Sequence, residues 1–360
     1  MAKISSASFY GEYHGHKVRH LECLYPRLRE SSDALIWTAG DSSLDNKYWF
    51  ADRRPAVGAY ADVLQPPSSV CDVTYWLNSL SEGRDRSGGA KGSSDGGDGG
   101  DLIGDAKYAA INAAVEATTL NERCLKLRPQ DRFLRDNIGS EDVLIVSIGG
   151  NDIALSPTPC TIAAVAGLLC LPMSCLEGLR SFGAVPINDC CCGCGPSVAS
   201  CTCSCPPCFG YFRHLFGTRT QKYIEALTAK TKPKKILVCT LYYPDENNTP
   251  SWANAALGAL GYNTNPAKIQ LLLRKIFEEC TSSVRIPGSQ VVPIPLFHPL
   301  DGTRSEDYVA RVEPSASGGR KMAEYMLDVI HGSGGSVDTR GMGKSSSLAP
   351  STSFIDGRAT

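Results

Sequence analysis

The sequence lacks a long hydrophobic run and an excess of charge of either sign. Its 360 residues include 36 lysines and arginines against 37 aspartates and glutamates. A chain with so little net charge has no electrostatic reason to bind nucleic acid or an anionic membrane surface, so we expect neither partner. The longest apolar run, residues 161–176, falls short of the ~20 residues that a membrane span needs, and it contains Pro172.

The first residues, MAKISSASFYGEYHGHK, lack the apolar core of a secretory signal. We therefore expect a cytoplasmic protein whose 16 cysteines are mostly not paired in disulfides. Residues 83–100 and 332–360 contain very few apolar side chains. Such segments cannot bury enough surface to offset the entropy of ordering, so we expect a disordered loop and a disordered tail around one domain at residues 9–331.

Short apolar segments rich in β-branched residues or alanine recur along the chain, as is typical of strands. They lie at residues 33–39, 107–112, 142–148, 235–241 and 290–296, with helical patterns between them. One such pattern spaces Val18, Leu21, Leu24 and Leu28 like the buried face of a helix, although Pro26 interrupts it. The alternation predicts an α/β fold with a mainly parallel five-stranded sheet covered on both faces.

Two polar turns follow predicted strands, and both carry residues suited to acyl chemistry. Gly-Asp-Ser-Ser at residues 40–43 follows the first strand, and Gly-Gly-Asn-Asp at residues 149–152 follows the third. Reacting groups gather at the carboxyl ends of the strands of a parallel sheet. Ser42 is therefore a candidate nucleophile, and the amide side chain of Asn151 is a candidate donor to an oxyanion.

The segments GDSSLDN and SIGGNDIAL resemble the first and third motif blocks of the GDSL or SGNH hydrolases. The resemblance implies a flavodoxin-like three-layer α/β/α sandwich. It also implies that Ser42 is the nucleophile, and that its backbone amide and the side chain of Asn151 form part of an oxyanion hole. Both blocks follow the expected strands, which favours a functional role over a capped turn.

The family's other two blocks are altered in this chain. Aligned by Asn112, the second block has Ala117 where the family has an oxyanion glycine. Alanine also offers a backbone N–H, so it can replace the glycine if the backbone needs no positive φ there. In the last block, which the family writes Asp-x-x-His, Glu313 occupies the place of the histidine and Ala310 that of the aspartate.

Three answers are open for the group that takes the proton of Ser42. His298 follows the last predicted strand, at the same edge of the sheet, with Asp301 or Asp307 available to orient it. Glu313 is a second candidate, provided that burial raises its pKa above the usual ~4.3. The third answer is that no group takes the proton and the site binds without turnover.

A cysteine-rich insertion at residues 157–218 lies between the third and fourth predicted strands. It contains two Cys-x-x-Cys pairs, Cys191 with Cys194 and Cys205 with Cys208. Two such pairs can close a tetrahedral zinc site, which would stabilise an insertion that has no core of its own. A disulfide cluster and acylated cysteines are the alternatives.

The sequence therefore supports two hypotheses of function. The first is a serine esterase that forms an acyl-enzyme on Ser42, takes a small-molecule or acylated ester as substrate and needs no cofactor for catalysis. The second is a catalytically impaired binding or scaffold protein that keeps the hydrolase fold and presents a metal-binding cysteine module.

Overall fold

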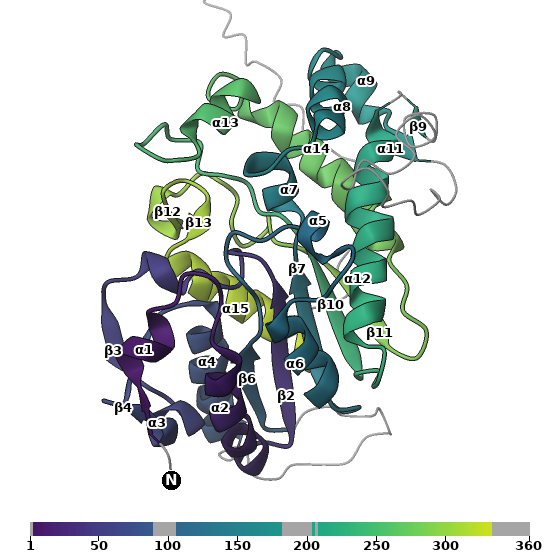
Figure 1. Ribbon diagram of the computed structural model, residues 1–360. Coiled ribbons are helices and arrows are strands. Elements are labelled where there is room, and N and C mark those ends of the chain that lie inside the picture. Colours follow the sequence, from purple (N-terminus) through teal and green to yellow (C-terminus); the bar gives the residue numbers. More distant parts are fainter. Residues whose placement is uncertain (1–2, 89–105, 182–203, 206–207, 333–360) are drawn as a thin grey trace, which may run out of the picture.

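A computed structural model of the chain describes residues 3–88, 106–181, 204–205 and 208–332. Its centre is a parallel sheet in the order β11-β10-β7-β2-β6 (Figure 1). The strands are β2 (Ala34–Gly40), β6 (Tyr108–Asn112), β7 (Val143–Ser147), β10 (Lys235–Thr240) and β11 (Gln290–Pro295). Each lies within two residues of its predicted bounds, and the predicted five-stranded parallel sheet is confirmed.

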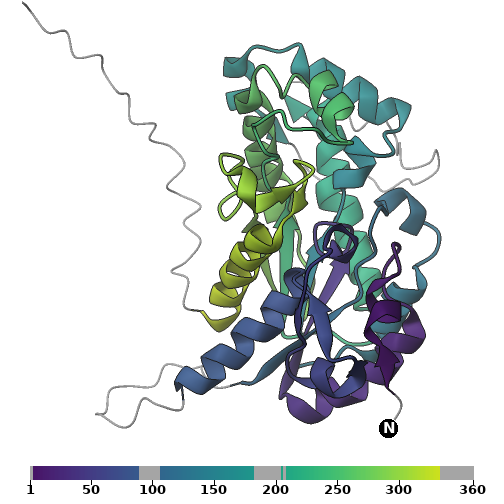
Figure 2. The same ribbon diagram turned by 90° about the vertical axis from the view of Figure 1, so that its left-hand side faces the viewer.

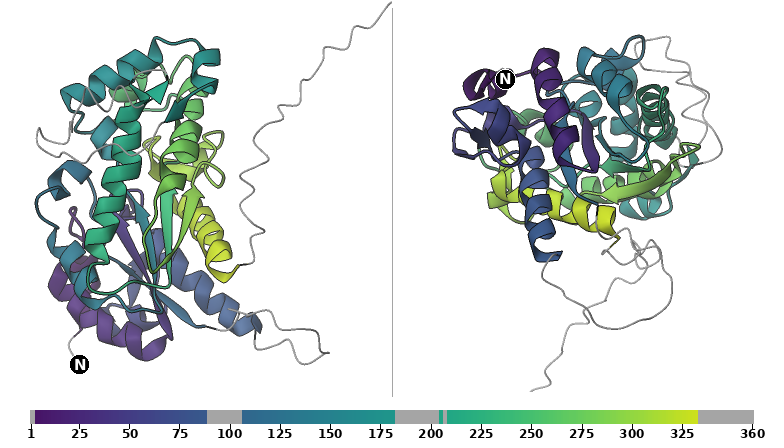
Figure 3. Two further views of the ribbon diagram at one scale, coloured as in Figure 1. Left: turned by 90° about the vertical axis from the view of Figure 1, so that its right-hand side faces the viewer. Right: turned by 90° about the horizontal axis from the view of Figure 1, so that it is seen from below.

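The helices cover both faces of this sheet, which confirms the three-layer sandwich. Helices α4 and α15 lie side by side on one face (Figure 2), and α2 lies on the other (Figure 3). The helices are α1 (Ser6–Tyr10), α2 (Val18–Ser31), α3 (Ala59–Val63), α4 (Val73–Gly88), α5 (Leu120–Arg123), α6 (Pro129–Asn137), α7 (Gly150–Ala154), α8 (Pro159–Leu169), α9 (Met173–Glu177), α11 (Phe209–Phe212), α12 (Thr220–Leu227), α13 (Asn254–Ala259), α14 (Pro266–Glu279) and α15 (Ala316–His331).

Shorter elements connect these layers. Pairs of small strands are β1 (Ile4–Ser5) with β4 (Leu64–Gln65), β3 (Arg53–Pro55) with β5 (Ser68–Val70), β8 (Arg180–Ser181) with β9 (Ser204–Cys205), and β12 (Tyr308–Val309) with β13 (Glu313–Pro314). Single turns of 3-10 helix are η1 (Lys47–Trp49), η3 (Thr281–Ser283) and η4 (Ser305–Asp307), and η2 (Arg213–Arg219) is a π-helix that continues into α12.

Strand β2 shows how the pattern of side chains builds two cores. Successive side chains of a strand point to opposite faces of the sheet. Leu35 and Trp37 enter the core beneath α2 and α6, whereas Ala34 and Ile36 enter the core beneath α4 and α15. All seven residues of β2 are buried. The central strand is therefore apolar on both faces, as expected for a parallel sheet covered on both sides.

Two helices run further than their sequences suggest. Helix α2 continues through Pro26, because Leu21, Leu24 and Leu28 are all buried against the sheet. At about 2 kcal/mol each, the three buried leucines together outweigh the ~3 kcal/mol cost of a proline inside a helix. Helix α4 extends to Gly88, so the disordered loop expected from residue 83 was predicted to begin too early. Residues 89–100 of that loop lie outside the described residues.

The insertion and the tail are only partly described. Residues 161–176, the longest apolar run, form parts of α8 and α9 with a break at Pro172. Residues 182–203 of the insertion and 333–360 of the tail lie outside the described residues. In the part of the chain that is described, we find no helix with both the length and the apolar character needed to cross a membrane.

Gly40 ends β2 and lets the next residues turn over the edge of the sheet. Its φ is 127°, and a Cβ atom at this position would lie 1.7 Å from the backbone oxygen of Ser147 on the neighbouring strand. Only glycine can therefore bring β2 this close to β7 at its last residue. The tight contact fixes the position from which residues 41–43 leave the sheet.

We expect Gly40→Ala to lower the free energy of unfolding by at least about 3 kcal/mol, because the added methyl group clashes with backbone that cannot move away. Gly261→Ala is the matched control, since Gly261 also has a positive φ, of 70°, but open space around it. That control should cost only about 1–2 kcal/mol. Urea unfolding measures both values, and equal losses would contradict the clash.

Candidate active site

Ser42 lies in the turn that follows β2, at the carboxyl edge of the sheet. The turn is fixed to the next strand by the amide of Asp41, which donates to the backbone oxygen of Ser147 at 3.0 Å. The carboxylate of Asp41 accepts from the backbone amide of Ser43 at 3.2 Å and from its hydroxyl at 2.8 Å. Asp41 and Ser43 are buried, whereas Ser42 between them is half-buried. The turn therefore presents the hydroxyl of Ser42 and holds the side chains of its neighbours inside.

The side chain that meets Ser42 is Glu313. The hydroxyl of Ser42 donates to Oε1 of Glu313 at 3.3 Å. Glu313 begins β13, which pairs with β12 in an antiparallel hairpin just before α15 (Figure 1). The side-chain amide of Asn46 donates to the backbone oxygen of Pro314 at 2.7 Å. This bond joins the hairpin directly to the segment that carries the nucleophile candidate.

Arg311, at the tip of the hairpin, anchors it on the other side. Its guanidinium is buried and donates to the backbone oxygen of Asp245. The same group donates to the side-chain oxygens of Asn248, Asn254 and Asn263 at 2.8–2.9 Å. Because Arg311 lies only two residues before Glu313, these bonds limit where the glutamate can go.

Glu313 is buried among other acidic side chains. Burial, together with the nearby carboxylates of Glu116 and Asp41, raises the pKa of Glu313 to about 8. Burial, followed by the charge of Asp45, also raises the pKa of Glu116 to about 7. The second carboxyl oxygens of Glu313 and Glu116 are buried without a hydrogen-bond partner among the described residues. Near neutral pH, Glu313 therefore carries a proton much of the time.

Glu116 belongs to the loop after β6 and is held by two groups from the segment after Ser42. The indole N–H of Trp49 donates to Oε1 of Glu116 at 2.7 Å. The backbone amide of Glu116 donates to the carboxylate of Asp45 at 2.9 Å, and Asp45 pairs with the fully buried Lys47 at 2.7 Å. The loop after β6 is thereby fixed against the segment that carries Ser42.

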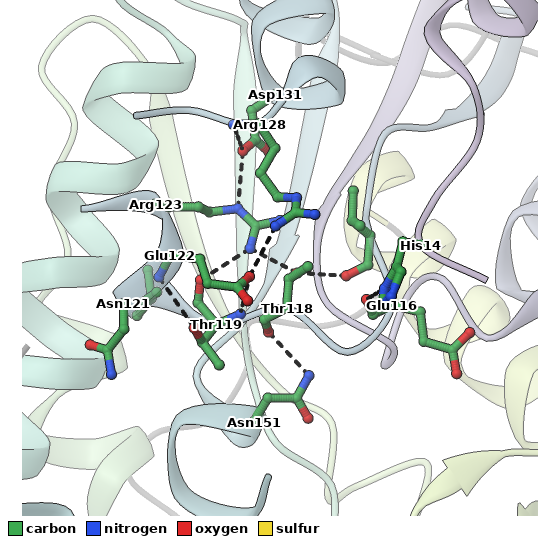
Figure 4. A network of polar contacts seen from close by, with 12 residues as sticks. His14, Glu116, Thr118, Thr119, Asn121, Glu122, Arg123, Arg128, Asp131 and Asn151 are labelled. Carbon is green, nitrogen blue, oxygen red and sulfur yellow. Dashed lines mark hydrogen bonds and ion pairs between the residues drawn. The ribbon is translucent and has the colours of Figure 1, made fainter. Parts of the chain in front are cut away.

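Asn151 and Ala117, the candidate oxyanion donors, line a cavity together with Ser42. One cavity of about 190 Å³ is lined by Ser42, Ala117, Asn151 and Glu313, among others. The side-chain amide of Asn151 donates to the backbone oxygen of Thr118 at 3.1 Å (Figure 4). Its second N–H has no acceptor among the described residues and can serve a ligand. Alanine was expected to replace the family's glycine if the backbone needed no positive φ. Ala117 has a φ of 55°, so this condition is not met and the residue is strained.

Arg123 stabilises the loop after β6, a role that the sequence does not indicate. Its buried guanidinium pairs with Asp131 at 3.0 Å and donates to the hydroxyl of Thr118 at 2.8 Å (Figure 4). It also donates to the backbone oxygen of Gly40 at 3.0 Å. One side chain thus joins the loop after β6 to the end of β2. No spacing in the sequence signals this role, because the partners of Arg123 come from separate elements.

Asp152 has a structural role that the motif alone does not reveal. Its carboxylate accepts from the backbone amides of Leu120 at 2.8 Å and Asn121 at 3.2 Å, at the start of α5. Asp152 therefore satisfies amides at the beginning of a short helix, while Asn151, its neighbour, lines the cavity that also contains Ser42. Gly149 allows both placements by taking a φ of 109° just before α7.

The structure does not bring His298 to Ser42. His298 is exposed after β11, the edge strand, where its Nδ1 lies 3.4 Å from the hydroxyl of Tyr325. Strand β11 is three strand positions from β2, or about 14 Å at the usual spacing. Asp301 accepts hydrogen bonds from Thr303 in its own loop. Asp307 accepts a hydrogen bond from Ser317 and forms an ion pair with Lys321, both in α15.

The zinc hypothesis stays a prediction. Cys191 and Cys194 lie outside the described residues, while Cys205 ends β9 and Cys208 precedes α11. Over the described residues, no three or more histidine, cysteine, aspartate or glutamate side chains are grouped so that they could hold a metal ion.

Comparison with known proteins gives similarity to solved structures only. No protein-family model and no curated protein matches the chain. Among solved structures, an acetyl xylan esterase from Geobacillus stearothermophilus is 14% identical with a TM-score of 0.38, covering 83% of this chain and 95% of that one. An extracellular lipase from Streptomyces rimosus is 12% identical with a TM-score of 0.36, covering 83% of this chain and 99% of that one. Such identities assign no role to single residues.

We expect Ala117→Gly to raise the free energy of unfolding by roughly 0.5–1 kcal/mol. Relief of the left-handed strain, about 1–2 kcal/mol, exceeds the extra entropy that a glycine loses on folding. The control is Ala109→Gly in β6, which has no positive φ to relieve and should lower stability by about 0.5–1 kcal/mol. Thermal or urea unfolding measures both changes, and a loss of stability in Ala117→Gly would refute the strain.

Proposed function

We propose that this protein is an ester hydrolase of the SGNH type, in which Ser42 is the nucleophile and Glu313 is the general base. The observation that carries the proposal is the hydrogen bond of 3.3 Å from the hydroxyl of Ser42 to Oε1 of Glu313, in a cavity that Asn151 also lines. A nucleophile needs a base within hydrogen-bond reach, and such bonds are often long before substrate binds. Among the candidates from the sequence, Glu313 has this geometry and His298 does not.

The reaction has two balanced halves. In the first, Oγ of Ser42 bonds to the ester carbonyl carbon while its proton moves to Glu313. The bond to the alcohol oxygen then breaks, and Glu313 returns the proton to the departing alcohol. In the second, water attacks the acyl-enzyme, Glu313 takes a proton from that water, and Ser42 leaves with the proton restored. The products are a carboxylic acid and an alcohol.

Burial makes a glutamate suitable for this work. A carboxylate with an ordinary pKa of ~4.3 is a weak base toward a serine hydroxyl. Because burial and neighbouring carboxylates raise the pKa of Glu313 to about 8, its carboxylate binds a proton far more strongly than an ordinary one does. The most effective general base has a pKa near the working pH. Glu313 therefore combines sufficient basicity with a useful population of the anion.

The oxyanion of the tetrahedral intermediate would be stabilised by three N–H donors. These are the second side-chain N–H of Asn151 and the backbone amides of Ser42 and Ala117. The bond from Asn151 to Thr118 and the brace of Arg123 keep the donors in place before substrate arrives. Donors fixed in advance cost no reorganisation at the moment of reaction.

We expect wild-type protein to hydrolyse p-nitrophenyl acetate and to react with a fluorophosphonate probe, and Ser42→Ala to lose both. Glu313→Gln should lower kcat by about 10²–10⁴, since removing a general base has that effect. His298→Ala is the control and should keep the wild-type rate, because His298 lies elsewhere on the sheet. Full activity in Glu313→Gln would exclude the proposed base, and loss of activity in His298→Ala would restore the histidine as a candidate.

We expect kcat/KM to rise with pH and to level off above about pH 8. Glu313 must have lost its proton to act as a base, and its pKa is raised to about 8. The pKa of Asp41 is raised to about 6 and that of Glu116 to about 7, so these groups titrate below Glu313. Glu116→Gln should shift the rise to lower pH, because a nearby negative charge is removed. A rate that falls between pH 6 and 8 would contradict this assignment.

A further inference from the structure

An apolar cavity of about 160 Å³ opens beside Ser42. Its polar end holds Asp41, Ser42, Asn151 and Glu313. The rest of its wall comes mainly from apolar side chains of α7, α8, α11, α13 and α14. Its buried members include Phe209, Phe212, Leu257, Leu272, Leu273 and Ile276. A pocket with reactive groups at one end and an apolar wall elsewhere fits a substrate that has a hydrocarbon chain next to its reacting carbon.

The second cavity, of about 190 Å³, shares Ser42, Asn151, Glu313 and Trp252 with the first but has a different wall. It contains the buried carboxyl of Glu116 and the indole of Trp49. Its rim includes Tyr13, which is 37% exposed, and Leu155, which is 43% exposed. Ser42 thus lies where two cavities meet. An ester has an acyl part and an alcohol part, and each cavity can hold one of them.

The two half-reactions indicate which part of the ester, the acyl part or the alcohol part, enters which cavity. The alcohol must receive a proton and depart, so it belongs in the cavity with a carboxyl group and an exposed rim. The acyl group stays bonded to Ser42 between the two half-reactions, so it belongs in the cavity with the buried apolar wall. Building on the proposed function, we infer that the substrates are esters of medium-chain carboxylic acids, with the hydrocarbon chain of the acid in the apolar cavity.

The volume of the cavity sets the length of the chain. A dry cavity of ~150 Å³ lined by leucine, isoleucine and phenylalanine holds a benzene molecule, which has six carbons. The cavity here, about 160 Å³, therefore suits an acyl group of about six carbons. Each methylene moved from water into such a site is worth about fourfold in binding. Four added methylenes, from acetyl to hexanoyl, then give a preference of about 10²-fold.

Two isomeric esters test which cavity holds the acyl part and which holds the alcohol part. Ethyl hexanoate and hexyl acetate have the same atoms and similar hydrophobicity, but they carry the long chain on opposite sides of the ester group. We expect kcat/KM for ethyl hexanoate to be higher by at least about tenfold. Equal values, or a preference for hexyl acetate, would overturn the inference while leaving Ser42 chemistry intact.

A pair of variants on one helix connects this preference to the cavity. Ala256 of α13 lines the apolar cavity and is half-buried, whereas its neighbour Ala255 is exposed and is not part of the wall. Ala256→Phe should lower the ratio of hexanoyl to acetyl ester hydrolysis by about tenfold or more, because the ring occupies the space of the chain. Ala255→Phe, the matched control, should leave the ratio unchanged. Equal ratios in the two variants would place the chain elsewhere.

Binding without turnover separates failure of this inference from failure of the proposed function. Ser42→Ala protein should bind hexanamide about 10²-fold more tightly than acetamide in a calorimetric titration, since amides are neutral and carry the same chain. If no ester is hydrolysed but this difference is found, the proposed hydrolase fails and the chain-binding cavity stands. If hexanamide binds no more tightly than acetamide, the inference fails whatever the enzyme activity.

Discussion

The site depends on a carboxyl group that is buried beside a serine and among other carboxylates. Desolvation and like charges both disfavour the anion of Glu313, so its proton is held well above the usual pH range of a glutamate. In the proposed reaction, the anion takes the proton of Ser42, and one negative charge leaves the cluster formed by Asp41, Asp45, Glu116 and Glu313. That charge appears on the oxyanion, next to N–H donors. The proton transfer is therefore favoured by the same repulsion that raises the pKa of the base.

This arrangement differs in its charges from a serine activated by histidine. A histidine base becomes a cation when it takes the proton, and an aspartate stabilises that cation. A glutamate becomes neutral, so it needs no third group to balance a new charge. The absence of an aspartate at Ala310 and the partnerless second oxygen of Glu313, among the described residues, fit a base that works without an orienting acid.

Since Ser42 is the side chain with a hydrogen bond to the carboxyl of Glu313 among the described residues, the backbone must hold Glu313 in place. The hairpin of β12 and β13 is fixed at its base by Asn46 and at its tip by Arg311. The side chain of Arg311 is buried against neutral oxygens of residues 245–263, the segment that also supplies α13 to the wall of the apolar cavity. The position of the base and the shape of the cavity thus share one anchor. A substrate chain that displaced α13 would act on the hairpin through Arg311.

The sequence by itself determined the sheet and the place of Ser42 and Asn151. Both follow from local patterns, since apolar β-branched runs mark buried strands and parallel strands end at a common edge. Only the tertiary structure shows that Glu313, and not His298, lies beside Ser42, because that placement depends on the path of residues 296–316 back across the sheet. Bonds between residues far apart in sequence, such as that of Arg311 to Asn248 and that of Asn46 to Pro314, fix that path. The same holds for α14, whose apolar side chains belong to the core but also supply part of the wall of the apolar cavity, which only the fold shows.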